Sequence, residues 1–268
     1  MKKLFHLENA DCPMLQELVE GDVSYTVLYK ILEYECDHIF SDGESFIICH
    51  SNPPYPVWVW CKSNANKECI KTIAKCIKEN FPLDKFEVTI SKDTLNELAK
   101  IDEYFKDIDI KVELLSYKLT KIESINYPCD GRMELADIKN LEAIAKIWQD
   151  MAFEMEGFEF DLEHCTNSVR DQIEEERLFV WKNANGEIVA TANYGILGSF
   201  GKVAGVYTLP NHRRKGYAIN LVSNVTKIII ENGVSSTLYT DGNYRASNEC
   251  YKKIGYKQVG QLLTIYKI

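Results

Sequence analysis

The stretch 207-YTLPNHRRKGYAINL-221 places three consecutive cations, Arg213, Arg214 and Lys215, directly before Gly216 at the expected start of a helix. The first N–H groups of a helix carry partial positive charge, so each exposed cation there opposes the helix dipole by ~0.3–1 kcal/mol. A bound anion would remove this conflict, and a glycine lets the backbone approach that anion without a Cβ in the way. The stretch therefore predicts a strand, an anion-binding loop and a helix.

The length of 268 residues suits two domains. The segment 120–131, TKIESINYPCDG, loses regular periodicity and contains Pro128 and Gly131, which marks it as the linker. We therefore expect an amino-terminal α/β domain over residues 1–127 and a second domain over residues 128–268.

Hydrophobic periodicity predicts helices and strands in both parts. In the first part we expect helices over 13–20, 23–34, 66–80 and 92–104, and strands over 45–50, 57–62, 86–90 and 110–119. In the second part we expect strands over 133–135, 178–182, 187–194, 202–208, 236–241 and 256–268, and helices over 137–151, 161–175, 214–231 and 246–254. Both parts contain a strand, a loop and a long helix in succession, and their endings LLSYKL and LLTIYKI are alike. If this internal similarity reflects a duplication, only the second copy kept the cations and their glycine.

The overall charge limits the classes of partner. A formal net charge of −9 and a pI near 5.2 argue against nucleic-acid binding, which needs a broad basic surface, and favour a cationic substrate. Nine cysteines without a CxxC pair, and no run of 18 apolar residues, predict a cytoplasmic protein with reduced thiols and no membrane association. We expect no metal, since Glu163, His164 and Cys165 have no second cluster at ligand spacing.

The stretch VYTLPNHRRKGYA resembles the acetyl-coenzyme A signature of the GNAT acetyltransferase superfamily, [RQ]xxGx[GA], with Arg213, Gly216 and Ala218 at its fixed positions. A second block, 239-YTDGNYRASNECYKKIGYK-257, resembles the later motif of that family. The resemblance covers residues 131–268. It implies an α/β (α+β) fold with a mixed, mostly antiparallel sheet flanked by helices. For the amino-terminal half two alternatives stay open, a smaller, degenerate GNAT-like domain in tandem or another α/β domain.

The resemblance also assigns roles, with acetyl-coenzyme A as co-substrate. The backbone of Val206, Tyr207 and Thr208 would contact the pantetheine arm, and the loop would hold the pyrophosphate through Arg213, Arg214, Lys215, Gly216, Tyr217 and Ala218. Tyr251 would protonate the departing sulfur; a tyrosine of the core is the alternative interpretation. The asparagine usual in the later motif is replaced by Tyr244, which leaves Asn248 as the polar contact nearby.

The acceptor side is less defined by the sequence. Glu154, Glu156 and Glu159 alternate with aromatic residues in MAFEMEGFEFD, a combination that suits an amine with an apolar body, although solvated carboxylates over core aromatics would look the same. The acceptor, the general base and the role of residues 1–127 stay open.

Two hypotheses follow. The first is an N-acetyltransferase that acts on a primary, cationic amine of a small molecule or peptide by direct attack in a ternary complex; a homodimer is one option for its oligomeric state. The second is a non-catalytic, coenzyme A-responsive binding or structural module.

Overall fold

The computed structural model describes residues 2–3, 18, 23–33, 38–51, 53–123, 127–156 and 160–268. The chain divides into two compact units. The first comprises Met1–Tyr117, Tyr239–Arg245 and Gln258–Ile268, and the second comprises Lys118–Leu238 and Ala246–Lys257. The helix expected over 13–20 lies almost wholly outside the described residues.

The first unit contains a mixed sheet whose neighbouring strands run in the order β1-β2-β3-β4-β5-β12-β6. The strands are β1 (Lys2–Lys3), β2 (His38–Ser41), β3 (Phe46–His50), β4 (Val57–Cys61), β5 (Val88–Ser91), β6 (Asp109–Leu119) and β12 (Lys257–Tyr266). The helices are α2 (Thr26–Glu33), α3 (Lys67–Asn80) and α4 (Lys92–Ile101). Strands β4 and β5 are parallel, because α3 forms a crossover between them.

Alternation along β3 and β4 builds a core on each face of this sheet. Phe46, Ile48, Val57 and Val59 pack with the apolar stripes of α3 and α4. The intervening residues, Ile47, Cys49, Trp58 and Trp60, pack with Tyr25 and Leu28 on the side of α2. This period of two is what the pleat of a strand buried on both faces requires.

Strand β12 completes the first unit, although it follows the second in sequence. It pairs antiparallel with β5 from Leu262↔Ser91 to Ile265↔Val88, and Leu262, Leu263 and Ile265 are buried in the two cores described above. The division into compact units therefore differs from a single boundary after residue 127.

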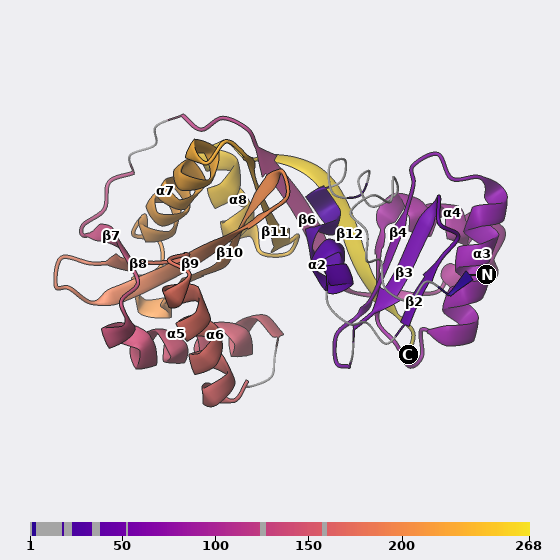
Figure 1. Cartoon of the computed structure of the whole chain (residues 1–268), viewed down its shortest axis with the longest axis horizontal. Coiled ribbons are helices and arrows are strands. Elements are labelled where there is room, and N and C mark those ends of the chain that lie inside the picture. Colours follow the sequence, from indigo (N-terminus) through magenta and orange to yellow (C-terminus); the bar gives the residue numbers. More distant parts are fainter. Residues whose placement is uncertain are drawn as a thin grey trace. The chain divides into compact units, whose positions relative to one another are not determined.

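The second unit contains the strand order β11-β10-β9-β8-β7. The strands are β7 (Arg132–Leu135), β8 (Leu178–Lys182), β9 (Ile188–Leu197), β10 (Phe200–Thr208) and β11 (Ser235–Asp241). The helices are α5 (Leu141–Glu156), α6 (Leu162–Glu174), α7 (Tyr217–Glu231) and α8 (Arg245–Ile254). Figure 1 shows α5 and α6 on one side of these strands and α7 on the other.

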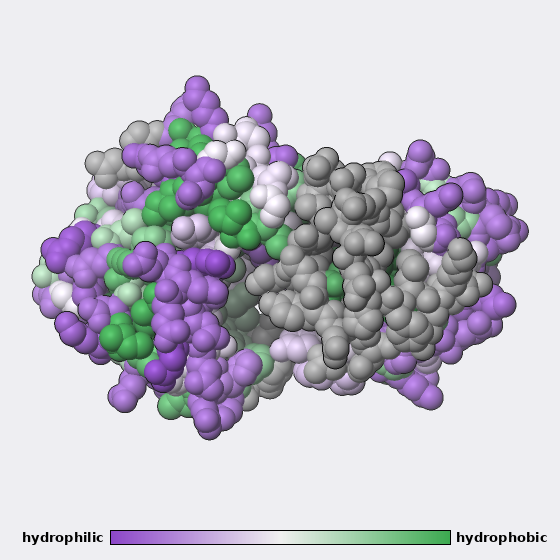
Figure 2. All heavy atoms as spheres, viewed as in Figure 1, coloured by the Kyte–Doolittle hydropathy of each residue, from purple (hydrophilic) through white to green (hydrophobic). Residues whose placement is uncertain are grey.

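Pairing is antiparallel from β7 to β10, and β10 is parallel to β11, with α7 as the crossover. The hydrophobic stripe of α7 covers β9 and β10 with Leu221, Val222, Val225 and Ile229, all fully buried. In Figure 2 hydrophilic residues cover much of this unit and hydrophobic groups interrupt them. Among the exposed hydrophobic side chains are Phe153, Met155 and Leu162, near the junction of α5 and α6.

The fold class expected from the sequence is confirmed: a mixed, mostly antiparallel sheet flanked by helices, with a second α/β unit. Several details differ. Strands β1 and β2 were not expected, α5 extends to Glu156 rather than to residue 151, and α7 begins at Tyr217 rather than at residue 214. The later start arises because Arg214 and Gly216 both adopt positive φ, 63° and 86°, which cannot continue a right-handed helix.

Candidate active site

The edge of β10 opens where its pairing with β11 ends. The two strands pair from Phe200↔Ser235 to Lys202↔Thr237, and no later pair joins them among the described residues. On the other edge, Tyr207 pairs with Thr191 of β9, and the N–H of Leu209 donates to the carbonyl of Val189. Because successive residues of a strand point their backbone groups to opposite edges, those of Thr208 point toward the open edge.

The loop after this edge leads to a helix start without a side-chain cap. Gly216 is the N-cap of α7, and the first backbone hydrogen bond of the helix runs from Asn220 N to Gly216 O at 3.2 Å. Arg214 and Lys215 are exposed and form no ion pair in the described part of the chain. Backbone donors, the positive end of a helix and two exposed cations lie together here, an arrangement that suits a bound anion.

In the first unit, the helix that follows the corresponding strand and loop, α3, begins with a side-chain cap. The first turn of α3 is capped by Asn66, whose Oδ1 accepts from Cys69 N at 2.9 Å. The side-chain oxygen therefore occupies the place that an external anion takes at an uncapped helix. The two strand–loop–helix segments thus differ in their helix starts: α3 has a side-chain cap, and α7 has none.

A short segment before β7 holds the helix start in place. Asn220 exchanges hydrogen bonds with the backbone of Tyr127, at 3.1 Å to its N and 2.9 Å to its O. Asp130 accepts from the hydroxyl of Tyr217 and from Ala184 N. This contact with Asp130 raises the pKa of Tyr217 to about 12. Tyr217 is buried, so its backbone N–H, rather than its side chain, is available to the candidate anion site.

Arg213 takes a position that the sequence did not predict. Its Nη2 donates to Glu154 Oε2 at 2.6 Å, its Nε donates to the Thr208 carbonyl at 3.0 Å, and its guanidinium lies 5.3 Å from the centre of the Tyr207 ring. The hydroxyl of Tyr207 donates to the same oxygen of Glu154 at 2.9 Å. Burial and this carboxylate raise the pKa of Tyr207 to about 12. Glu154 thus joins α5 to the end of β10 and to the loop before α7.

Of the other acidic residues expected at the acceptor side, the side chain of Glu156 and all of Glu159 lie outside the described part of the chain. A polar group not found from the sequence is Asn193 of β9. It is 9% exposed, and its Oδ1 has no hydrogen-bond partner among the described residues. A Cβ at Gly205 would lie 3.2 Å from this Oδ1 and 3.3 Å from Trp148 Cζ2, so the chain passes close to both at the irregularity in β10.

Tyr251 and Asn248 lie on α8, and both are buried. The ring of Tyr251 packs edge-on against that of Tyr256 at 6.2 Å. Burial raises the pKa of Tyr251 above its ordinary value, so the phenol keeps its proton across the neutral range. Tyr251 therefore has the protonation state that a proton donor needs.

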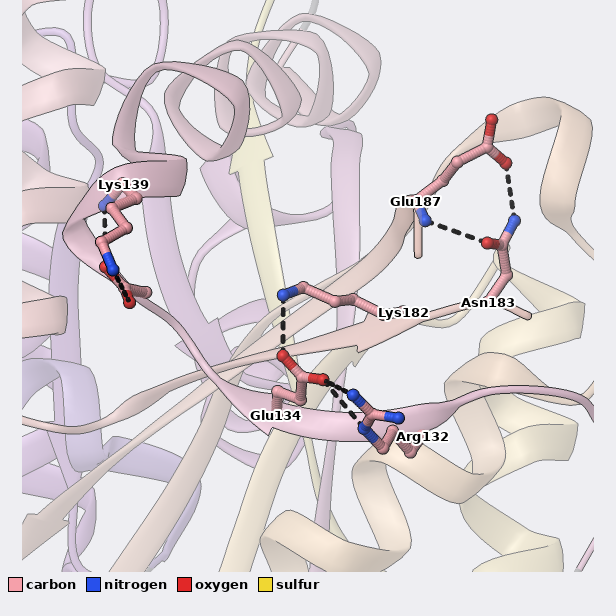
Figure 3. Close-up of polar contacts among 7 residues, drawn as sticks. Arg132, Glu134, Lys139, Lys182, Asn183 and Glu187 are labelled. Carbon is pink, nitrogen blue, oxygen red and sulfur yellow. Dashed lines mark hydrogen bonds and ion pairs between the residues drawn. The ribbon is translucent and has the colours of Figure 1, made fainter. Parts of the chain in front are cut away.

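Other charged groups of the second unit pair with one another at a distance from β10 in the strand order. At the outer edge of the second unit's sheet, Glu134 accepts from Arg132 and Lys182, with both ion pairs at 2.7 Å (Figure 3). Asn183 Nδ2 donates to the carboxylate of Glu187 in the turn that follows β8. Strand β9 separates both groups from β10, and exposed pairs of this kind contribute little to stability.

Comparison with known proteins finds similar folds. Residues 184–264 match the family model described as FR47-like protein. An acetyltransferase of the GNAT family from Colwellia psychrerythraea superposes with a TM-score of 0.67 at 15% identity, over 99% of each chain. A GCN5-related N-acetyltransferase from Sphaerobacter thermophilus superposes with a TM-score of 0.64 at 12% identity, over 94% of this chain and 88% of that one.

A third solved structure, a GCN5-related N-acetyltransferase from Kribbella flavida, has a TM-score of 0.56 at 16% identity over 91% and 93% of the two chains. No curated protein matches the sequence. The resemblance to the GNAT superfamily is thus confirmed at the level of the fold, and the likeness extends over the first unit as well as the second. Within the described part of the chain, every helix is too short or too polar to span a bilayer.

Proposed function

We propose that this protein is an acyltransferase that uses acetyl-coenzyme A and transfers its acetyl group to a primary amine. The observation that carries the proposal is the uncapped start of α7 at Gly216, with Arg214 and Lys215 exposed beside it, immediately after the open edge of β10. These groups fit a diphosphate, whose charge would relieve the cluster of cations. The likeness of the fold to GNAT acetyltransferases supports the same class of reaction.

In this proposal, Arg214, Lys215 and the first amides of α7 hold the pyrophosphate, while the backbone at Val206 and Thr208 binds the pantetheine arm along the edge of β10. A backbone N–H near Val206 donates to the oxyanion that develops as the amine attacks the thioester carbonyl. One preorganised donor of this kind is worth ~2.7–4 kcal/mol in the transition state. When the C–S bond breaks, Tyr251 gives its proton to the departing thiolate.

The amine nitrogen forms the new C–N bond directly, so no residue of the chain becomes acetylated. An alkyl amine has an ordinary pKa of about 10.4 and must lose its proton before it attacks. Glu154, Tyr207 and Asn193 offer polar atoms on the side of α5 and α6, which suits a cationic amine.

The test is release of coenzyme A thiol from acetyl-coenzyme A across a panel of primary amines, preceded by a thermal-shift measurement with coenzyme A. A ligand at 100 times its Kd is expected to stabilise the protein by about 2.7 kcal/mol. Amine-dependent thiol release supports the proposal. Binding without release from any amine would instead support a non-catalytic module, and a lack of binding would contradict both.

A further inference from the structure

We propose that Cys61 and Cys69 form a reversible oxidation site, in which a hydroperoxide oxidises Cys69 and Cys61 then closes a disulfide with it. The site lies in the first unit and does not depend on the proposed transferase activity. In the structure neither thiol is in a disulfide, and the two side chains are hydrogen-bonded to each other.

The fold brings the two thiols together from consecutive elements. Cys61 is the last residue of β4, and Cys69 lies in the first turn of α3. Hydrogen bonds define the short connection between them: Ala65 N donates to the carbonyl of Lys62 at 3.1 Å, and Asn66 caps the helix. The end of the strand and the start of the helix are therefore held close together. Thiols that are already in contact can form an S–S bond without a large movement of the backbone.

Cys69 is the thiol better suited to attack a peroxide. It lies at the positive end of α3, where a helix start stabilises a thiolate. The hydrogen bond from Cys61 lowers the pKa of Cys69 below its ordinary value, while burial and the charge of Asp42 oppose this effect. The exposed fraction of Cys69 is 7%, and that of Cys61 is larger. Hydrogen peroxide, which is hardly larger than water, can therefore reach the pair.

Cys61 is suited to the second step. The hydrogen bond to Cys69 and burial raise the pKa of Cys61, so its thiol stays protonated in the reduced protein. Oxidation of Cys69 replaces the thiolate by a neutral sulfenic acid, which removes the charge that holds the proton on Cys61. The sulfur of Cys61 can then attack the sulfenic sulfur.

The two steps balance as a two-electron oxidation. The thiolate of Cys69 attacks one oxygen of hydrogen peroxide, the O–O bond breaks, and the hydroxide that leaves takes up the proton lost by Cys69 to become water. Cys61 then forms the S–S bond, the S–O bond breaks, and the hydroxide leaves with the proton of Cys61 as a second water. Two thiols are oxidised and one peroxide is reduced. A dithiol reductant reverses the reaction by thiol–disulfide exchange.

Cys76, further along α3, provides the internal comparison. Its side chain is fully buried, and burial raises the pKa of Cys76 to about 11. The thiolate fraction falls tenfold for each unit of pKa above the pH, whereas the nucleophilicity of the thiolate rises only about threefold. Two units of pKa are therefore expected to make Cys69 roughly tenfold faster than Cys76 toward peroxide.

The first experiment uses the full chain, reduced, freed of reductant and treated with one equivalent of hydrogen peroxide. After alkylation of the remaining thiols, trypsin cleaves behind Lys62 and Lys67, between the two cysteines. A disulfide therefore joins two separate peptides, 68–71 and the peptide that ends at residue 62. Mass spectrometry is expected to find these peptides linked, and dithiothreitol is expected to release them. Absence of the linked pair would overturn the proposal.

Single substitutions separate the two steps. In Cys61→Ser, dimedone is expected to trap a sulfenic acid on Cys69, whereas in Cys69→Ser it should leave Cys61 unlabelled. Labelling of Cys61 as fast as that of Cys69 would overturn the assignment of the attacking thiol. Cys76→Ser is the matched control on the same helix, and it should form the link between residues 61 and 69 at the wild-type rate. Loss of the link in this control would also count against the proposed pair.

Thermal unfolding gives a second readout on the wild type itself. A disulfide from Cys61 to Cys69 constrains the unfolded chain, so the oxidised protein should unfold about 5–10 °C above the reduced one. Cys61→Ser should show no such shift after the same treatment. An unchanged or lower midpoint of the oxidised wild type would contradict a disulfide that fits the native fold. Because the readouts concern the first unit and need no coenzyme, failure of the protein to bind coenzyme A would leave them unaffected.

Discussion

Replacement of Gly216 by alanine tests the anion-binding loop directly. Gly216 has φ of 86°, and a Cβ there would lie 3.1 Å from Pro128 O and 3.4 Å from Cys129 Cβ. The left-handed conformation costs a non-glycine residue ~1–2 kcal/mol. At roughly 2–4 °C per kcal/mol for a chain of this size, the thermal midpoint should fall by about 2–8 °C.

The loss of affinity for coenzyme A is expected to be larger than the loss of stability. The new Cβ would displace the loop at the point where, in the proposed site, backbone N–H groups donate to the phosphate. A hydrogen bond to a charged group contributes ~1.5–3 kcal/mol, so loss of one weakens the Kd of coenzyme A by about 10- to 150-fold. Isothermal calorimetry gives this value, and a thermal scan without ligand gives the stability term separately.

Gly233→Ala supplies the control at the other end of the same helix. Gly233 has a similar φ of 83°, but a Cβ there would meet nothing within 4 Å. Its replacement should reduce stability by a similar backbone term and leave coenzyme affinity intact. Equal coenzyme affinity in the two variants would refute the assignment of the loop as the phosphate site.

Three further predictions concern other parts of the chain. Tyr251→Phe should lower kcat with little change in the Kd of coenzyme A, and an unchanged kcat in this variant would assign the proton to another donor. Because burial raises the pKa of this phenol, the wild-type rate should show no loss from ionisation of Tyr251 below about pH 10. Asn66→Ala should reduce stability by about 1 kcal/mol through loss of the α3 cap, without any change in coenzyme A binding; altered binding would show that the first unit takes part. Deletion of residues 257–268 should unfold the first unit, seen as loss of its protected amides in hydrogen exchange, since β5 loses one of its two partner strands and both cores lose buried side chains. A native exchange pattern would contradict this role of β12.

Local chemistry explains what the sequence could predict. The alternation in FIICH and VWVWC, the stripe of α7 and the glycine beside three cations each lie within one short segment, and their positions follow from periodicity and backbone sterics. The helices, most strands and the loop that leads to Gly216 could therefore be predicted from the sequence. The roles assigned to the site residues stay predictions.

Contacts between segments that are distant in the sequence could not be predicted in this way. Glu154 and Arg213 are separated by 59 positions, and the sequence around either residue contains no signal that the two form an ion pair. The same holds for Asn220, whose amide meets the backbone of Tyr127. The placement of β12 was hidden for a different reason: LLSYKL and LLTIYKI have nearly the same apolar pattern, so the sequence does not show which strand joins which unit.

The position of β12 has a consequence for biosynthesis. Residues 257–266 leave the ribosome after the whole of the second unit, yet their buried leucines and isoleucine fill the cores of the first. The amino-terminal half must therefore wait, incomplete, while translation proceeds through the rest of the chain. A premature stop codon close to the end of β11 would damage the half of the protein that was made first.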